Sequence, residues 1–189
     1  EQISPELRAA LEKAAENVRT YYSKHELSRH EITKDGMSIK SRLLPLRSAG
    51  CYVPGGKASY PSTVIMTAIP AEMAGVERIV VAVPPNPDGR ISQSVLAAAA
   101  IAGVQEVHPI GGAQAVAALA YGTEEVEPVD VIVGPGNIYV SLAKQEVSGK
   151  VRVPASFAGP SEVVVVADET ASPDLVALDL IVQAEHGPD

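Results

Sequence analysis

Hydrophobic and polar positions recur at helical spacing in the first stretch of the chain. Leu7, Leu11 and Val18 lie on one side of a helix if residues 5–24 are helical. The residues just before them, SPE at 4–6, combine a cap, a first-turn proline and an early acid. The pattern predicts an amphipathic helix that ends at about Lys24.

Residues 25–49 are polar and of mixed charge, and they contain KDG at 34–36 as a turn signal. A strand is expected somewhere within residues 37–50.

Beyond Tyr52, short apolar runs alternate with segments of helical pattern. The runs are rich in Val and Ile and do not alternate with polar residues, as in strands covered on both faces. Alternation at this spacing predicts βαβ units and a parallel sheet. The expected strands are 78–85, 104–110 and 129–136, and the expected helices are 63–75, 92–103, 113–122 and 137–149.

A further block begins near residue 154. Val163–Ala167 has the pattern of a buried strand, and a helix is expected from Ser172 to about His186. Gly187 and Pro188 would end that helix. Its packing side is predicted to be Leu175, Leu178 and Val182.

Loops dense in Gly and Pro follow these runs, and in an open parallel sheet such loops share the edge at which ligands bind. GPGN at 134–137 is placed for a phosphate at a helix N-terminus, although Tyr139 stands where a dinucleotide fingerprint has its third glycine. GGAQ at 111–114 is a second such turn. PGGKAS at 54–59 is similar to a Walker A loop, but Ala58 replaces the Ser or Thr that holds Mg²⁺, which excludes ATP use. Each turn alone has a structural explanation, whereas several together favour a nucleotide-sized ligand.

Composition narrows the class of protein. Of the 189 residues, 46% are hydrophobic and 20% charged, so a globular protein is expected. The net charge of −8 disfavours nucleic-acid partners and anionic membranes. No run of apolar residues is long enough to span a bilayer and no signal peptide is visible, so the cytoplasm is expected. The single cysteine, Cys51, fits a reducing compartment and is interpreted as a small buried hydrophobe.

Asp179, Gln183 and His186 form a polar stripe on the last helix. They could be a solvent-facing stripe, with His186 stabilised by the helix dipole, or half of a zinc site. Spacing alone favours the solvent stripe. Ser161 has no neighbouring His and no GxSxG elbow, so a hydrolase triad is unsupported. His25, His30 and His108 are interpreted as surface or locally satisfied histidines.

Several long motifs, in this order, closely resemble those of the histidinol dehydrogenase family: YVPGGKASYPS, GGAQAVAALAYGTEEV, PVDVIVGPGN, AGPSEVVVVAD and QAEHGPD. The resemblance implies an enzyme that uses NAD and zinc to oxidise L-histidinol to L-histidine through L-histidinaldehyde. It implies NAD contacts at Tyr52, Gln114 and Asn137.

The same resemblance implies that Ser161, Gln183 and His186 contact the substrate, and that Gln183 and His186 also bind zinc. The family's acid–base Glu–His pair and its other zinc ligands lie beyond QAEHGPD. The chain therefore looks like a truncated N-terminal portion that contains no catalytic residue and has no turnover alone. In the full-length protein the resemblance implies a homodimer.

The family also implies a division of the chain into a Rossmann-like NAD-binding domain and a second α/β domain that is split in sequence and incomplete. The expected parts are 1–50 and 163–189 for the companion domain and 51–162 for the Rossmann-like domain. Two alternatives stay open, a non-catalytic nucleotide-binding or assembly module and an aldehyde-dehydrogenase-like oxidoreductase. The second needs a nucleophilic cysteine, and Cys51 has no adjacent base.

Overall fold

A computed structural model describes residues 3–25, 30–56, 58–155 and 162–182. The chain divides into two compact units, Glu1–Ser156 and Phe157–Asp189. The proposed domain limits at residues 51 and 162 remain predictions.

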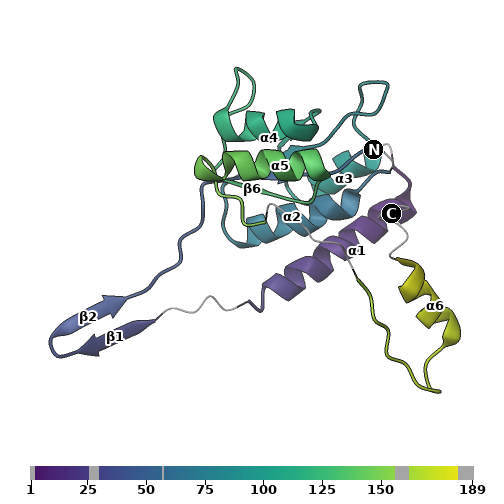
Figure 1. Cartoon of the computed structure of the whole chain (residues 1–189), viewed down its shortest axis with the longest axis horizontal. Coiled ribbons are helices and arrows are strands. Elements are labelled where there is room, and N and C mark those ends of the chain that lie inside the picture. The colour runs from purple at the N-terminus through teal and green to yellow at the C-terminus, as the bar shows by residue number, and fades with distance from the viewer. Residues whose placement is uncertain (1–2, 26–29, 57, 156–161, 183–189) are drawn as a thin grey trace. The chain divides into compact units, whose positions relative to one another are not determined.

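The first unit carries almost all of the regular structure (Figure 1). Its elements, in chain order, are α1 (Pro5–Tyr22), β1 (Glu31–Lys34), β2 (Met37–Lys40), β3 (Ser48–Tyr52), α2 (Pro61–Met73), β4 (Arg78–Ala82), α3 (Gln93–Ile101), β5 (Glu106–His108), α4 (Gly112–Tyr121), β6 (Val131–Val133), α5 (Ile138–Glu146) and the 3₁₀ turn η1 (Val147–Gly149).

Four strands form a parallel sheet in the order β5-β4-β3-β6, as the alternation of apolar runs predicted. In β3, Gly50 is paired with Val80 of β4 on one side and with Ile132 of β6 on the other. An isolated parallel bridge joins Val131 to Arg152, next to β6. The sheet is therefore that of an α/β fold with a parallel core.

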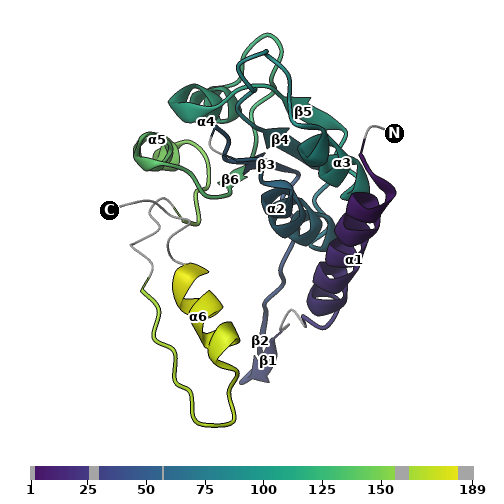
Figure 2. The ribbon, with the colours of Figure 1, turned by 90° about the vertical axis from the view of Figure 1, so that its right-hand side faces the viewer.

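Helices cover both faces of this sheet. Figure 2 shows the strands between α1, α2 and α3 on one face and α4 and α5 on the other. Side chains of β4 alternate between two buried clusters, because successive residues of a strand point to opposite faces. Val81 joins the cluster beneath α2 and α3, and Val80 and Ala82 join the cluster beneath α4 and α5.

The polar stretch before the sheet forms a β-hairpin, β1–β2. The predicted turn lies between the two strands, where Asp35 and Gly36 have φ of 49° and 79°. Positive φ at both central residues is what a two-residue hairpin turn of type I′ requires. All residues of both strands are exposed.

The second unit differs from the sequence prediction at its strand. The structure assigns Val163–Ala167 to no strand, and Val164 and Val166 are exposed by 86% and 93%. A run of this composition becomes a strand only when a neighbouring strand accepts its ladder hydrogen bonds, and no other strand lies among the described residues of this unit.

Helix α6 (Pro173–Ile181) forms near its predicted start, after the cap position Ser172. Leu175, Leu178 and Val182 were predicted to pack, but they are exposed. That expectation is wrong for the described residues, because the part of this unit that the structure describes supplies no second layer to cover them. In the described ranges of the chain, no helix is both long and apolar enough to cross a membrane.

Candidate functional site

The order of winding in the sheet reverses at β3. From β3 the chain moves outward to β4 and then β5, and α4 brings it back over the opposite face to β6, on the other side of β3. In open α/β sheets a ligand binds outside the carboxyl ends of the strands at such a reversal. The candidate site therefore lies where the loops after β3 and β6 begin.

The Gly-rich loops meet at this edge, as the sequence predicted. A Cβ atom on Gly55, in the loop after β3, would lie 3.3 Å from the ring of Pro84, which follows β4. A Cβ atom on Gly111, after β5, would lie 2.4 Å from Cγ of the same ring. The loops after β3, β4 and β5 thus meet at Pro84. Any side chain larger than hydrogen at Gly111 would push the loop after β5 away from Pro84.

Tyr52, the last residue of β3, joins the same edge to α4. The backbone N–H of Gly112 donates to the Tyr52 hydroxyl at 3.0 Å, which satisfies a donor that the start of a helix leaves without a helical partner. The Tyr52 side chain is buried. Its hydroxyl proton is left for one further acceptor.

Gly134, the first residue after β6, makes the closest contact of the edge. It has φ of 103°, and a Cβ atom there would lie 2.0 Å from the backbone oxygen of Tyr52. Only glycine fits, because both the left-handed backbone and the space exclude a side chain. The ends of β3 and β6 are therefore in direct backbone contact at the reversal.

Gln114 and Asn137 stand at the starts of the two helices that leave this edge. Gln114 lies in the first turn of α4 and is exposed. Asn137 caps α5, and its Oδ1 accepts the backbone N–H of Val140 at 3.1 Å. Capping uses the oxygen and leaves the exposed side-chain amide N–H₂ as a donor. Tyr52, Gln114 and Asn137 are thus all placed at the carboxyl edge.

Cys51 lies in β3 and is fully buried, which confirms its interpretation as a small hydrophobe. Burial raises the pKa of the Cys51 thiol to about 11, although Thr67 opposes this by hydrogen bonding. At neutral pH the residue is a thiol rather than a thiolate, so it is not a nucleophile.

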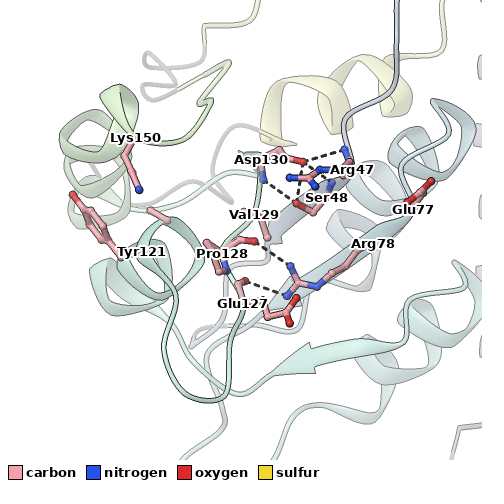
Figure 3. Close-up of a pocket in the computed structure, with 11 residues that line it drawn as sticks. Arg47, Ser48, Glu77, Arg78, Tyr121, Glu127, Pro128, Val129, Asp130 and Lys150 are labelled. Carbon is pink, nitrogen blue, oxygen red and sulfur yellow. Dashed lines mark hydrogen bonds between the residues drawn. The ribbon is translucent and has the colours of Figure 1, made fainter.

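A cavity of about 510 Å³ lies at the opposite, amino edge of the sheet (Figure 3). Hydrogen bonds between its own residues hold its wall together. Asp130 Oδ2 accepts the backbone N–H groups of Arg47 and Ser48 at 3.0 and 2.9 Å, and Ser48 Oγ accepts the N–H of Asp130 at 3.0 Å. The bond from the Ser48 backbone is the main cause that lowers the pKa of Asp130. This polar ring fixes the starts of β3 and β6 and is structural.

Arg78 performs the same task for β4 and β5. Its guanidinium donates to both carboxylate oxygens of Glu106 at 2.9 and 2.8 Å and lowers the pKa of that carboxyl. His108 Nε2 lies 2.9 Å from Glu106 Oε1, so this histidine is locally satisfied, as expected. His25 and His30 are exposed, also as expected.

Three of the predicted site residues, Ser161, Gln183 and His186, lie outside the described residues. Within the described ranges no group of three or more His, Cys, Asp or Glu side chains could hold a metal ion.

Comparison with known proteins decides the family. The family model described as histidinol dehydrogenase matches residues 1–189. The chain belongs to the histidinol dehydrogenase family. The histidinol dehydrogenase of Pseudomonas savastanoi pv. phaseolicola is 56% identical over 189 residues, which are 100% of this chain and 42% of that protein. The Geobacillus kaustophilus enzyme is 54% identical over 185 residues, 97% of this chain and 43% of that protein.

A solved structure agrees. The crystal structure of histidinol dehydrogenase from Elizabethkingia anophelis superposes with a TM-score of 0.90 at 41% identity, covering 98% of this chain and 43% of that one. The chain thus spans less than half the length of these histidinol dehydrogenases.

Two residues of the site were not predicted from the sequence. The sequence pattern puts Pro84 only near the end of an expected strand. Its contacts with the loops after β3 and β5 depend on the tertiary fold. Lys144 lies buried on α5. A usable signal existed, since a lysine at 144 interrupts the apolar positions Val140 and Val147 on the packing face of a helix.

We expect Gly134→Ala to destabilise the protein far more than Gly89→Ala. Gly89 also has positive φ, 79°, but a Cβ atom there meets nothing within 4 Å. The control should cost about 1–2 kcal/mol for its left-handed backbone. Gly134→Ala adds the clash with Tyr52 and should cost at least about 3 kcal/mol. Urea unfolding followed by circular dichroism measures both, and equal losses would show that β3 and β6 are not in contact here.

Proposed function

We propose that this chain forms the NAD-binding part of a zinc-dependent enzyme that oxidises L-histidinol to L-histidine through L-histidinaldehyde. The observation that carries the proposal is the match to the histidinol dehydrogenase family over residues 1–189. The meeting of the loops after β3, β4, β5 and β6 at one edge supports it, because a dinucleotide needs such a surface.

The residues at the carboxyl edge of the sheet have the chemical groups that a dinucleotide needs. The Gly-rich loops let backbone approach a ligand closely, and the start of α5 favours negative charge. We assign NAD contacts to the Tyr52 hydroxyl, the Gln114 side chain and the Asn137 amide. Gln114 and Asn137 are exposed at the starts of α4 and α5, and Tyr52 keeps one hydroxyl proton to donate.

Substrate contacts are assigned to Ser161, Gln183 and His186, and zinc contacts to Gln183 and His186. A His nitrogen and a Gln carbonyl oxygen are acceptable zinc ligands, but two ligands do not close a site. When bound, zinc would orient the imidazole and amino groups of histidinol toward the nicotinamide. The acid–base pair that the family uses is not among residues 1–189.

The exposed apolar side chains of α6 support further structure around this helix in the full-length enzyme. Leu175, Leu178, Leu180 and Ile181 on α6 are each more than half exposed. An uncovered apolar helix of this kind is expected to be buried against further structure, so we infer a companion domain in the full-length enzyme. The homodimer that we propose for that enzyme rests on the family match alone.

The aldehyde-dehydrogenase-like alternative is disfavoured by the buried, protonated Cys51. A non-catalytic nucleotide-binding module would share the NAD-binding surface, so the zinc measurement below distinguishes it.

Asn137→Asp should separate capping from ligand binding. Aspartate keeps a capping oxygen for the Val140 N–H but replaces the amide donor with a negative charge. We expect an unchanged thermal midpoint and an NAD⁺ dissociation constant raised by about tenfold or more, since the loss of a charged hydrogen bond costs about 1.5–3 kcal/mol. The exposed Asn17 on α1 provides the matched control, Asn17→Asp. Calorimetric titration measures both variants, and equal NAD⁺ affinities would remove Asn137 from the site.

Zinc affinity tests the half-site. His186→Ala should weaken Zn²⁺ binding by at least about 10- to 100-fold, because loss of a group that only orients a metal ligand already costs about that much. His30→Ala, which removes an exposed histidine, is the control and should leave binding unchanged. Calorimetry with Zn²⁺ compares the three proteins. Identical affinities would mean that the QAEHGPD segment does not bind zinc in this chain and would favour the non-catalytic module.

Residues 1–189 alone are expected to bind NAD⁺ but not to reduce it. The assay follows the near-ultraviolet absorbance of NADH after the protein is mixed with histidinol and NAD⁺. NAD⁺ binding by the same sample serves as the control for folding. Sustained NADH formation would show that the acid–base pair of the family is not required.

A further inference from the structure

Lys144 is 2% exposed although it carries an ammonium group. Lysine is almost never fully buried unless its charge has a partner. The residue lies on the packing face of α5, where its neighbours Val140 and Val147 belong to the apolar cluster beneath the helix. Burial at this position needs a reason that packing does not supply.

The partner of Lys144 is the backbone of the candidate site. Its Nζ donates to the carbonyl oxygen of Gly134, the first residue after β6. In the part of the chain that the structure describes, no carboxylate forms an ion pair with it. Loss of solvent lowers the pKa of the ammonium below its usual range. The buried ammonium group of Lys144 therefore binds the carbonyl oxygen of Gly134.

Gly134 is held from two sides. Its Cα faces the Tyr52 backbone so closely that a Cβ atom would lie 2.0 Å from the Tyr52 oxygen, and its own carbonyl is bound by Lys144. Three residues later the loop reaches Asn137, the cap of α5. Lys144 lies seven residues beyond Asn137, about two turns of helix, and so on the same side of α5. The lysine thus ties the loop to the helix that the loop begins.

We propose that Lys144 is a positioning residue for dinucleotide binding, which fixes the 134–137 turn through the Gly134 carbonyl and so holds the Asn137 amide toward the ligand. The lysine itself does not touch the ligand. The inference rests on the proposed NAD-binding function, and it adds a residue that acts through Asn137.

Lys144→Met keeps the length of the side chain and removes the donor. The Gly134 carbonyl then has no ammonium to hold it, and the turn is free to change the direction of Asn137. The same substitution at Lys150, which is exposed six residues further on, is the matched control. Both variants lose one positive charge, so an effect of net charge alone would be equal in the two.

The experiment measures two quantities on the 189-residue chain. Calorimetry gives the NAD⁺ dissociation constant, and hydrogen exchange by NMR gives the protection of the Val140 amide, which donates to Asn137. Lys144→Met should raise the dissociation constant about tenfold and speed Val140 exchange at least tenfold, whereas Lys150→Met should match the wild type. In an Asn137→Asp background, Lys144→Met should add less than about a twofold loss of affinity, because both changes remove the same contact.

Each outcome separates the two proposals. If the wild type does not bind NAD⁺, the proposed function fails, and Val140 exchange still tests the positioning. Unchanged affinity and unchanged exchange in Lys144→Met overturn the role of Lys144 alone, as does full additivity with Asn137→Asp. Should the methionine variant not fold, Lys144→Gln retains a neutral donor on a shorter side chain, and wild-type affinity with wild-type exchange in that variant overturns the need for the charged lysine.

Discussion

The backbone contact between Gly134 and Tyr52 is the constraint on which the rest of the candidate site depends. It joins β3 to β6 at the point where the winding of the sheet reverses. The reversal opens a binding edge between neighbouring strands, and the contact requires glycine at the first position after β6. Helix α5 starts at Ile138, shortly after this position, and its cap, Asn137, lies at the same edge.

The two edges of the sheet are built for different purposes. At the amino edge, Asp130 and Arg78 use their hydrogen-bonding capacity on neighbouring residues, so these two charged groups in the wall of the 510 Å³ cavity already have partners. At the carboxyl edge, glycines and Pro84 bring loops into contact while Gln114 and Asn137 remain exposed. The presence of a cavity alone would therefore favour the amino edge, whose hydrogen bonds are structural. The exposed side chains of Gln114 and Asn137 and the glycine-rich backbone favour the carboxyl edge as the binding site.

The Gly134 contact is held by a group that itself needs explanation. A buried ammonium is unfavourable unless it is well solvated by the protein, and the carbonyl of Gly134 is its partner among the described residues. A methionine at 144 would fill the same volume without a charge to desolvate. A lysine at this point therefore costs stability in α5 and in return holds the 134–137 turn through the Gly134 carbonyl.

The sequence by itself determined the parallel α/β sheet, because Val- and Ile-rich runs that alternate with helical segments have few other arrangements. It also determined the family, through long motifs such as GPGN and QAEHGPD. Tertiary structure alone decided the strand order, the meeting of three loops at Pro84 and the pairing of Lys144 with Gly134. These are contacts between residues that local pattern does not connect. The same reason explains the wrong prediction at Val163–Ala167, since a strand forms only when another strand lies beside it.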